Sequence, residues 1–210
     1  MRVAQPSCHL SHGPDPVRAA ALQCPVLYWA HGQTAVLCGT NLSNVAVVGA
    51  GAESSIIDGG GWPWYAAGVK NHSMQGQGPR LFEVAWTRNV TLAHVTFQNA
   101  PSWTVHPTYC TGVLAHHIKI LNPRFAPNTD GFDPDSSTDV VLHDSTIDTG
   151  DDGISIKSGN SSACRGCSHI QVRTGSFSHS RYAKLRHFHA RVDDFESPTK
   201  YSINMCSMLL

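Results

Sequence analysis

Hydrophobic and polar residues alternate in several short segments of this 210-residue chain, and these segments recur along its length. Each begins with a polar residue: Asn44-Val-Ala-Val, Asn89-Val-Thr-Leu, His117-Ile-Lys-Ile, Asp139-Val-Val-Leu and His169-Ile-Gln-Val. Their first residues are separated by 45, 28, 22 and 30 positions. Alternation with a period of two is typical of β-strands, and a repeat of about 20 to 50 residues is typical of a solenoid.

The first interval is about twice the others, so we expect a disguised repeat within it, with Leu81-Phe-Glu-Val as a candidate strand. Second short strands are expected at Val95-Thr-Phe97, Ser145-Thr-Ile147 and Ile154-Ser-Ile156. Several short strands per repeat, separated by Gly, Asn, Pro and Asp, predict an all-β protein built as a right-handed parallel β-helix. A β-sandwich is the alternative fold, because it also uses short alternating strands.

The repeat divides the chain into three predicted parts. Residues 36–177 carry the alternating segments and are expected to form the β-helix, with the candidate chemistry on one face. An irregular segment is expected at 1–35 and an irregular tail at 178–210, since neither shows strand alternation. A solenoid needs covered ends, and this tail offers no obvious cap.

Charge and hydropathy exclude several classes of partner. Fifteen Lys and Arg balance fifteen Asp and Glu, so no net field attracts nucleic acid or anionic lipid. No segment approaches the ~20 apolar residues of a membrane span, so we expect no membrane anchor. No signal peptide is visible in the sequence. We also expect a monomer. Seven cysteines and four N-glycosylation triplets weakly favour an oxidising, secretory setting. Cys164 and Cys167 have zinc-ligand spacing, but no second pair follows, so we expect a disulfide or a free thiol and no metal.

Two segments are dense in carboxylates, Asn128-Thr-Asp-Gly-Phe-Asp-Pro-Asp and Asp148-Thr-Gly-Asp-Asp-Gly. Asp130 and Asp151 are 21 positions apart, so we expect them at equivalent points on adjacent coils, with Asp152 beside them. A coil step of ~4.8 Å with a lateral offset is compatible with the ~6.5–9.5 Å between the carboxyl groups of an inverting glycosidase. Crowding should raise the pKa of at least one of them. The alternative is that Asp and Gly gather here because turns require them.

Residues 122–159, from Asn-Pro-Arg-Phe through Gly-Asp-Asp-Gly-Ile-Ser-Ile-Lys-Ser-Gly, resemble the central signature of the polygalacturonases of glycoside hydrolase family 28. A weaker similarity runs from Gly39 through Ile57-Asp-Gly-Gly-Gly-Trp to Trp103-Thr-Val-His-Pro. The resemblance implies a pectin-lyase-like solenoid that hydrolyses α-1,4-galacturonosyl linkages of pectin with inversion, outside the cell and without a cofactor. By resemblance, Asp151 is the general acid, Asp130 and Asp152 activate the attacking water, and Asn128 helps to order the site.

The same resemblance implies that His106 and Lys157 lie near the sugar-binding cleft, where a cationic lysine favours ionised carboxylates and meets a uronic acid. The alternatives are an exposed strand residue at Lys157 and a structural histidine before a proline turn at His106. Family members carry a Gly-His-Gly and then an Arg-x-Lys downstream of the Asp-Asp pair, and neither occurs in this sequence. His179, within Ser-His-Ser, is the candidate substitute for the histidine.

These departures leave three functional hypotheses open. The first is a pectin hydrolase in a C-terminally truncated or altered form. The second is a catalytically incomplete β-helix that binds pectin or has no activity. The third is a polysaccharide lyase on a similar coil, which would need calcium and a basic residue for proton abstraction.

Overall fold

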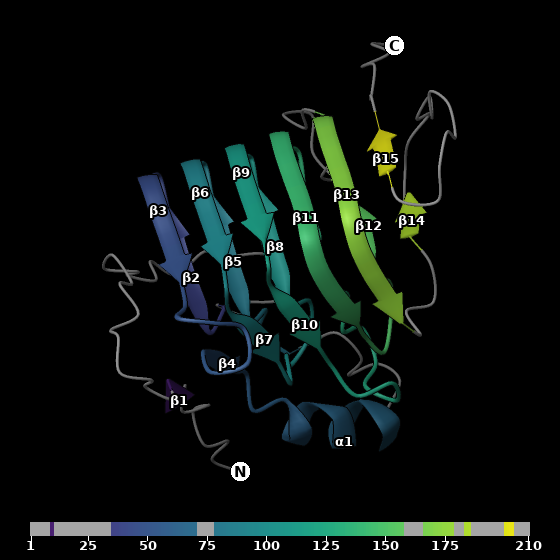
Figure 1. Cartoon of the computed structure of the whole chain (residues 1–210). Coiled ribbons are helices and arrows are strands. Elements are labelled where there is room, and N and C mark those ends of the chain that lie inside the picture. Colours follow the sequence, from purple (N-terminus) through teal and green to yellow (C-terminus); the bar gives the residue numbers. More distant parts are fainter. Residues whose placement is uncertain are drawn as a thin grey trace.

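The computed structural model of the chain describes residues 9–10, 35–70, 78–157, 166–178, 183–185 and 200–203. Its strands stack as parallel β-coils around a common core, as predicted (Figure 1). His179 and Cys164 lie outside the described residues. The predicted boundaries at 1–35, 36–177 and 178–210 stay predictions.

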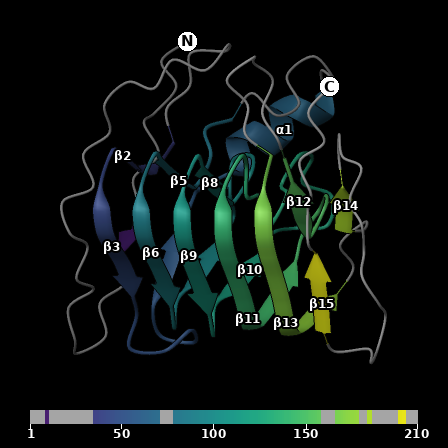
Figure 2. The ribbon, with the colours of Figure 1, turned by 90° about the horizontal axis from the view of Figure 1, so that it is seen from above.

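Three parallel faces form the coil. The first face consists of β3 (Ser43–Val48), β6 (Arg88–Ala93), β9 (Thr111–His116), β11 (Thr138–Asp148) and β13 (Ser168–Ser178), side by side in chain order (Figures 1 and 2). The second face consists of β4 (Ile56–Asp58), β7 (Thr96–Gln98), β10 (Lys119–Leu121) and the second halves of β11 and β13. The third consists of β2 (Leu37–Thr40), β5 (Phe82–Ala85), β8 (Val105–Thr108), β12 (Ile154–Ile156) and β14 (Ala183–Leu185), with residues 132–135 bridging β8 and β12.

Other elements flank these coils. The short strands β1 (His9–Leu10) and β15 (Lys200–Ile203) pair antiparallel with β4 and β13. Helix α1 (Trp62–Lys70) lies between β4 and β5 in the sequence. Among the described residues no helix has the length and hydropathy needed to cross a bilayer.

The alternation seen in the sequence builds the core. On the first face, Val45, Val90, Val113, Val140 and Ile170 occupy one register position on successive coils, and all are buried. Each strand on this face begins around a left-handed residue, such as Asn44 or Asn89 with φ of 56° and 55°. Asn and Asp tolerate this conformation better than most residues, which explains the polar residue at the start of each segment.

Two details of the predicted repeat were wrong. Lys119 and Ile120 of the segment His117-Ile-Lys-Ile lie in β10 on the second face, and Gly112 is the residue equivalent to Asn89. The long first interval contains no extra coil, because β3 pairs directly with β6. Its length comes instead from the segment that carries α1. Leu81-Phe-Glu-Val does contain a strand, β5, but on the third face.

Candidate active site

The third face carries two columns of side chains that point away from the core. Phe82 and Val84 of β5 belong to the core cluster, so the residues that alternate with them point outward. The register aligns the first outward column as Glu83, His106, Asp133 and Ser155. It aligns the second as Ala85, Thr108, Asp135 and Lys157. His106 and Asp133 are nevertheless only 1% and 0% exposed, so this face contains buried ionisable groups.

Lys157 contacts two carboxylates of the preceding coil, those of Asp130 and Asp133. Its Nζ lies 2.8 Å from Oδ2 of Asp133 and 3.3 Å from Oδ2 of Asp130. The ammonium also lies 4.0 Å from the centre of the Trp103 ring, and the Arg80 guanidinium lies 4.7 Å from the same ring centre. Burial acts to lower the pKa of Lys157, but the carboxylates of Asp133 and Asp130 outweigh it and raise that pKa above its usual value. Lys157 is therefore a charged residue at the centre of an ion-pair network.

His106 lies in a second buried network. Its Nδ1 lies 3.0 Å from Oε1 of Glu83, and its Nε2 lies 3.7 Å from Oδ2 of Asp135. Burial acts to lower the pKa of His106, but its interactions with the carboxylates of Asp135 and Glu83 raise it overall. Burial acts to raise the pKa of Asp135, but its interaction with His106 lowers it overall. His106 occupies strand β8 and not a proline turn, and its ring packs edge-on against Trp103 at 5.0 Å.

The turn before β12 holds the Gly-Asp-Asp sequence against the preceding coil. Gly150 N donates to Thr129 Oγ1 at 3.2 Å, and Asp152 N donates to Oδ1 of Asp151 at 2.9 Å. A Cβ on Gly150 would lie 2.2 Å from the Ala126 carbonyl oxygen, so this approach requires glycine. Asn128 adopts a φ of 57° in the preceding coil, which explains an asparagine two residues before Asp130.

The register places Asp130 opposite Asp152, not Asp151 as the spacing suggested. Gly131 N donates to the Asp152 carbonyl at 2.8 Å, and Phe132 pairs with Ile154, a shift of one residue from the expected match. Asp130 and Asp152 are 6% and 3% exposed, whereas Asp151 is only partly buried. The carboxylates remain close enough to interact, because the charge of Asp151 raises the pKa of Asp130 and that of Asp152 raises the pKa of Asp133.

Crowding and burial do raise the pKa of one carboxyl group, as expected. Burial first, and then the charge of Asp133, raise the pKa of Asp130 to about 8, although Lys157 acts in the opposite direction. Asp133 is fully buried, and this burial also raises its pKa against the pull of Lys157. Burial and crowding therefore favour the protonated form of Asp130, whereas Lys157 favours the ionised form.

Comparison with known proteins assigns this arrangement to a family. The profile of Glycosyl hydrolases family 28 matches residues 26–179. The chain belongs to glycosyl hydrolases family 28. It is 36% identical over 126 residues to a probable polygalacturonase of Vitis vinifera, and 33% identical over 136 residues to an endo-polygalacturonase of Pectobacterium carotovorum subsp. carotovorum. These matches cover 60% of this chain, and 25% and 33% of the two relatives.

Solved structures of the family show the same fold. A polygalacturonase from Erwinia carotovora ssp. carotovora matches with a TM-score of 0.62 and 29% identity, over 70% of this chain and 40% of that one. An endo-xylogalacturonan hydrolase from Aspergillus tubingensis also gives 0.62, at 23% identity, over 72% and 40% of the two chains. The predicted right-handed parallel β-helix is confirmed, and the chain spans between 25% and 40% of the length of these relatives.

The candidate active site contains residues that the sequence did not single out individually. Asp133, Glu83 and Asp135 contact Lys157 and His106, yet in the sequence they lie beside Pro134 or in an ordinary strand. The signal that identifies them is their outward position in register with His106 and Lys157. Cys167 is a buried free thiol, one of the two expected alternatives.

Asn at position 130 should change how stability depends on pH. The pKa of Asp130 is about 8 in the folded chain against a usual 3.8, so between these values the folded state holds a proton that the unfolded state has released. Stability of the wild-type chain therefore falls as pH rises from about 4 to 8. Asp130→Asn removes this loss, and Lys157 keeps its contact with Asp133. One pKa unit corresponds to about 1.4 kcal/mol, so we expect a gain of about 2 kcal/mol or more at pH 8 that shrinks toward pH 4.

Urea unfolding at several pH values measures this effect. The control is Asp139→Asn, because Asp139 is 58% exposed by side chain and lies on the first face. An identical pH slope for Asp130→Asn and the wild-type chain would show that Asp130 does not hold the proton.

Gly150→Ala should displace the Gly-Asp-Asp turn. The added Cβ would lie 2.2 Å from the carbonyl of Ala126 and 2.6 Å from that of Pro123, and neither backbone atom can move alone. We expect a loss of about 1–3 kcal/mol in the free energy of unfolding. Gly51→Ala is the matched control, because its Cβ would meet only Ser54 Oγ at 3.4 Å. Equal unfolding midpoints for the two variants would contradict the proposed close approach.

Proposed function

We propose that this chain carries the catalytic face of an enzyme that hydrolyses α-1,4-galacturonosyl linkages in pectin by single displacement with inversion. The observation that carries the proposal is the meeting of Asp130, Asp151 and Asp152 on adjacent coils beside Lys157. Family membership supports it, and so do the relatives named as polygalacturonases. The substrate is accordingly a pectic polysaccharide, and the place of action is outside the cell.

The exposure of the three acids supports different roles. Asp151 is the most accessible, so we assign it as the general acid that protonates the glycosidic oxygen. Asp130 and Asp152 lie opposite each other on adjacent coils and form the pair that activates water. Because burial and crowding raise the pKa of Asp130, we propose that Asp152 is the residue that accepts the proton of the attacking water.

The proposed substrate-binding residues divide by burial. Lys157 is 14% exposed by side chain and lies 2.8 Å from Asp133, so it offers a uronic acid a partly shielded cation. His106 is 1% exposed, which supports a positioning role through Glu83 and Asp135 in preference to direct sugar contact. Asn128 sets the turn before Asp130. His179 stays a prediction from the sequence.

Turnover of polygalacturonic acid tests the proposal. We expect new reducing ends to appear, and we expect the first-formed product to show inverted anomeric configuration by NMR. Activity should persist in a chelator, since the assigned residues need no metal. Loss of activity in chelator would favour the lyase mechanism, and retained configuration would exclude the single displacement.

A pectin-binding β-helix without turnover is the second candidate. The observation that favours it is the absence from this sequence of a Gly-His-Gly and an Arg-x-Lys after Asp152. Calorimetric titration with galacturonate oligomers separates the two. Binding without turnover supports the binding protein, and neither binding nor turnover supports an inactive chain.

A further inference from the structure

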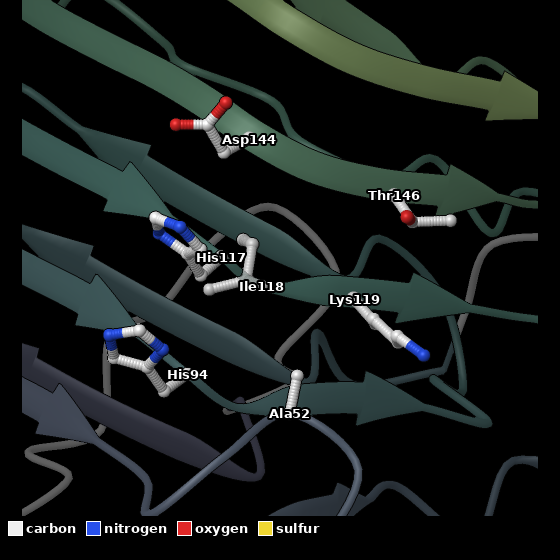
Figure 3. A pocket seen from close by; sticks show the side chains of 7 residues that line it. All are labelled: Ala52, His94, His117, Ile118, Lys119, Asp144 and Thr146. Carbon is white, nitrogen blue, oxygen red and sulfur yellow. The ribbon is translucent and has the colours of Figure 1, made fainter.

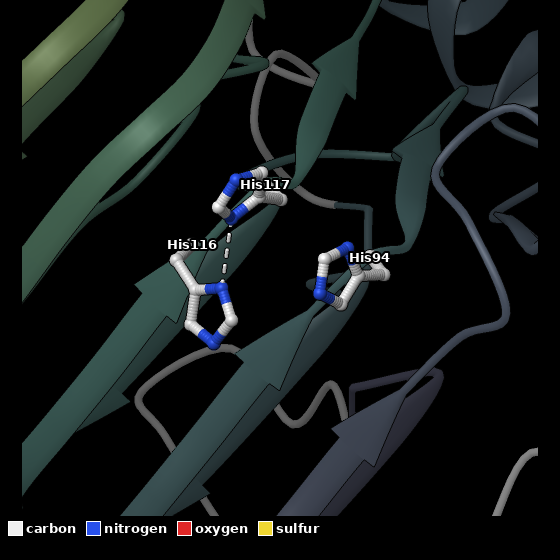
Figure 4. A group of neighbouring side chains, drawn as sticks. All are labelled: His94, His116 and His117. Atoms are coloured by element: carbon white, nitrogen blue, oxygen red, sulfur yellow. Dashed lines mark hydrogen bonds between the residues drawn. The ribbon is translucent and has the colours of Figure 1, made fainter.

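Three histidines lie together at a corner of the coil, away from the third face and its carboxylates. His94, His116 and His117, which we call the histidine corner, lie where the first face turns into the second. Their candidate ligand nitrogens all lie within 4.8 Å of one another. Figure 4 shows the rings of His116 and His117 on one side, with a nitrogen of His94 turned toward them. The candidate active site lies on the third face, so this group serves a different purpose.

The backbone explains why neighbouring histidines point the same way. In a regular strand His116 and His117 would point to opposite sides. His117 instead has a φ of 50°, which breaks the alternation, so that both side chains lie outside between buried Ala115 and Ile118. His94 has a φ of 53° at the same corner of the preceding coil, and its ring stacks on that of His117 at 4.9 Å.

The geometry suits a metal ion held by imidazoles. Nδ1 of His116 and Nδ1 of His117 are 3.0 Å apart. Two nitrogens bound to one tetrahedral Zn²⁺ at about 2.0–2.1 Å lie about 3.3 Å from each other, so a small opening of this pair admits the ion. Imidazole nitrogen is a preferred ligand for zinc and copper.

The surroundings of the histidine corner leave room for an ion and place a carboxylate nearby. A hollow of about 270 Å³ lies beside the corner (Figure 3) and is lined by Ala52, His94, His117, Ile118, Lys119, Asp144 and Thr146. The cation of Lys119 is paired with Glu53, which reduces its repulsion of a metal ion. The His143 ring stacks on His116 at 5.2 Å, and His143 Nδ1 lies 2.7 Å from Asp144. A carboxylate therefore lies on the same corner, one coil further along.

We propose that the histidine corner binds one divalent transition-metal ion, with Zn²⁺ as the probe, and thereby links two successive coils. His94 belongs to the coil of β6, whereas His116 and His117 belong to the coil of β9. A bound ion would tie these coils together at the surface, and a ligand that binds only the folded state raises its stability. The proposal does not depend on the proposed hydrolysis.

Zinc titration of the untagged chain tests the site. We expect one Zn²⁺ per chain by calorimetry and a rise in Tm with added zinc. His94→Asn and His117→Asn remove the imidazole but suit the left-handed backbone, and His116→Gln suits the strand. Each should weaken zinc binding by more than about 100-fold, because even residues that only orient metal ligands cost 10- to 100-fold.

His169→Asn is the matched control. His169 also has a positive φ of 52° and a side chain 68% exposed, but it pairs with Asp139 at the other end of the first face. Its zinc affinity should equal that of the wild-type chain. Absence of zinc binding by the wild-type chain would overturn the proposal, and so would equal binding by the three corner variants and His169→Asn.

Discussion

Asp151→Asn is expected to lower kcat on polygalacturonic acid by about 10²- to 10⁴-fold, the usual contribution of a general acid. The amide cannot protonate the glycosidic oxygen, so the leaving group would depart as an alkoxide. The side chain keeps its shape, and its Oδ1 can still accept the hydrogen bond from Asp152 N. The fold should therefore survive, and binding of galacturonate oligomers should change little. Reducing-end assays give kcat, and calorimetry gives the affinity.

The control for this loss is Asp139→Asn. Asp139 has a φ of 56°, which asparagine tolerates, and its side chain is 58% exposed on the first face. It makes the same chemical change without touching the third face, so activity should equal that of the wild-type chain. Retention of more than about a tenth of kcat by Asp151→Asn would assign the acid to another residue.

Lys157→Met is expected to destabilise the chain by about 3–5 kcal/mol at neutral pH, because it removes the cation from a buried ion-pair network. Asp133 is 0% exposed and would lose the ammonium at 2.8 Å, and Asp130 would lose its contact at 3.3 Å. Methionine fills a similar volume beside Trp103, so lost packing is a small part of the cost. Urea unfolding at pH 7 measures the change.

Two further measurements show that charge causes this loss. Lys157→Met/Asp133→Asn should recover part of the stability, because the buried carboxylate that lost its partner is removed. The loss should also shrink as the pH falls and Asp133 takes up a proton, since burial already raises the pKa of that carboxyl group. Lys119→Met is the surface control: its partner Glu53 has a side chain 84% exposed, so we expect less than about 1 kcal/mol. Equal losses at positions 157 and 119 would contradict the buried network.

The fold was predictable because burial on one side of a strand leaves a period of two in the sequence. The segments starting at Asn44, Asn89, Asp139 and His169 share one face, and all were found in this way. Alternation does not reveal which face a strand joins, and so His117-Ile-Lys-Ile was aligned with the wrong strands. The interval that contains α1 was misread for a related reason, since chain length alone does not distinguish a coil from an insertion.

Within the candidate site, the sequence singled out residues that fall in short sequence motifs. It missed residues whose place in the site depends on how successive coils align. Asp130, Asp151 and Asp152 fall in short motifs, and their catalytic roles stay predictions. Asp133 stands in the segment that is dense in carboxylates, but no local pattern marks it among them: it lies beside Pro134, and proline argues against a strand. It becomes visible only once Phe132 is paired with Val105 and Ile154, which places Asp133 in line with His106.

Helix α1 lies in a segment that can change without altering the register between β3 and β6. The segment that carries it leaves β3 and β6 paired directly, so a change in its length would leave the stacked coils aligned. The helix also packs against the turn that leads to Asp130. The ring centres of Trp62 and Tyr65 lie 5.7 and 6.3 Å from that of Phe125 in this turn. A change in this segment should therefore alter the packing around the turn that leads to Asp130 while the register of the coils is kept.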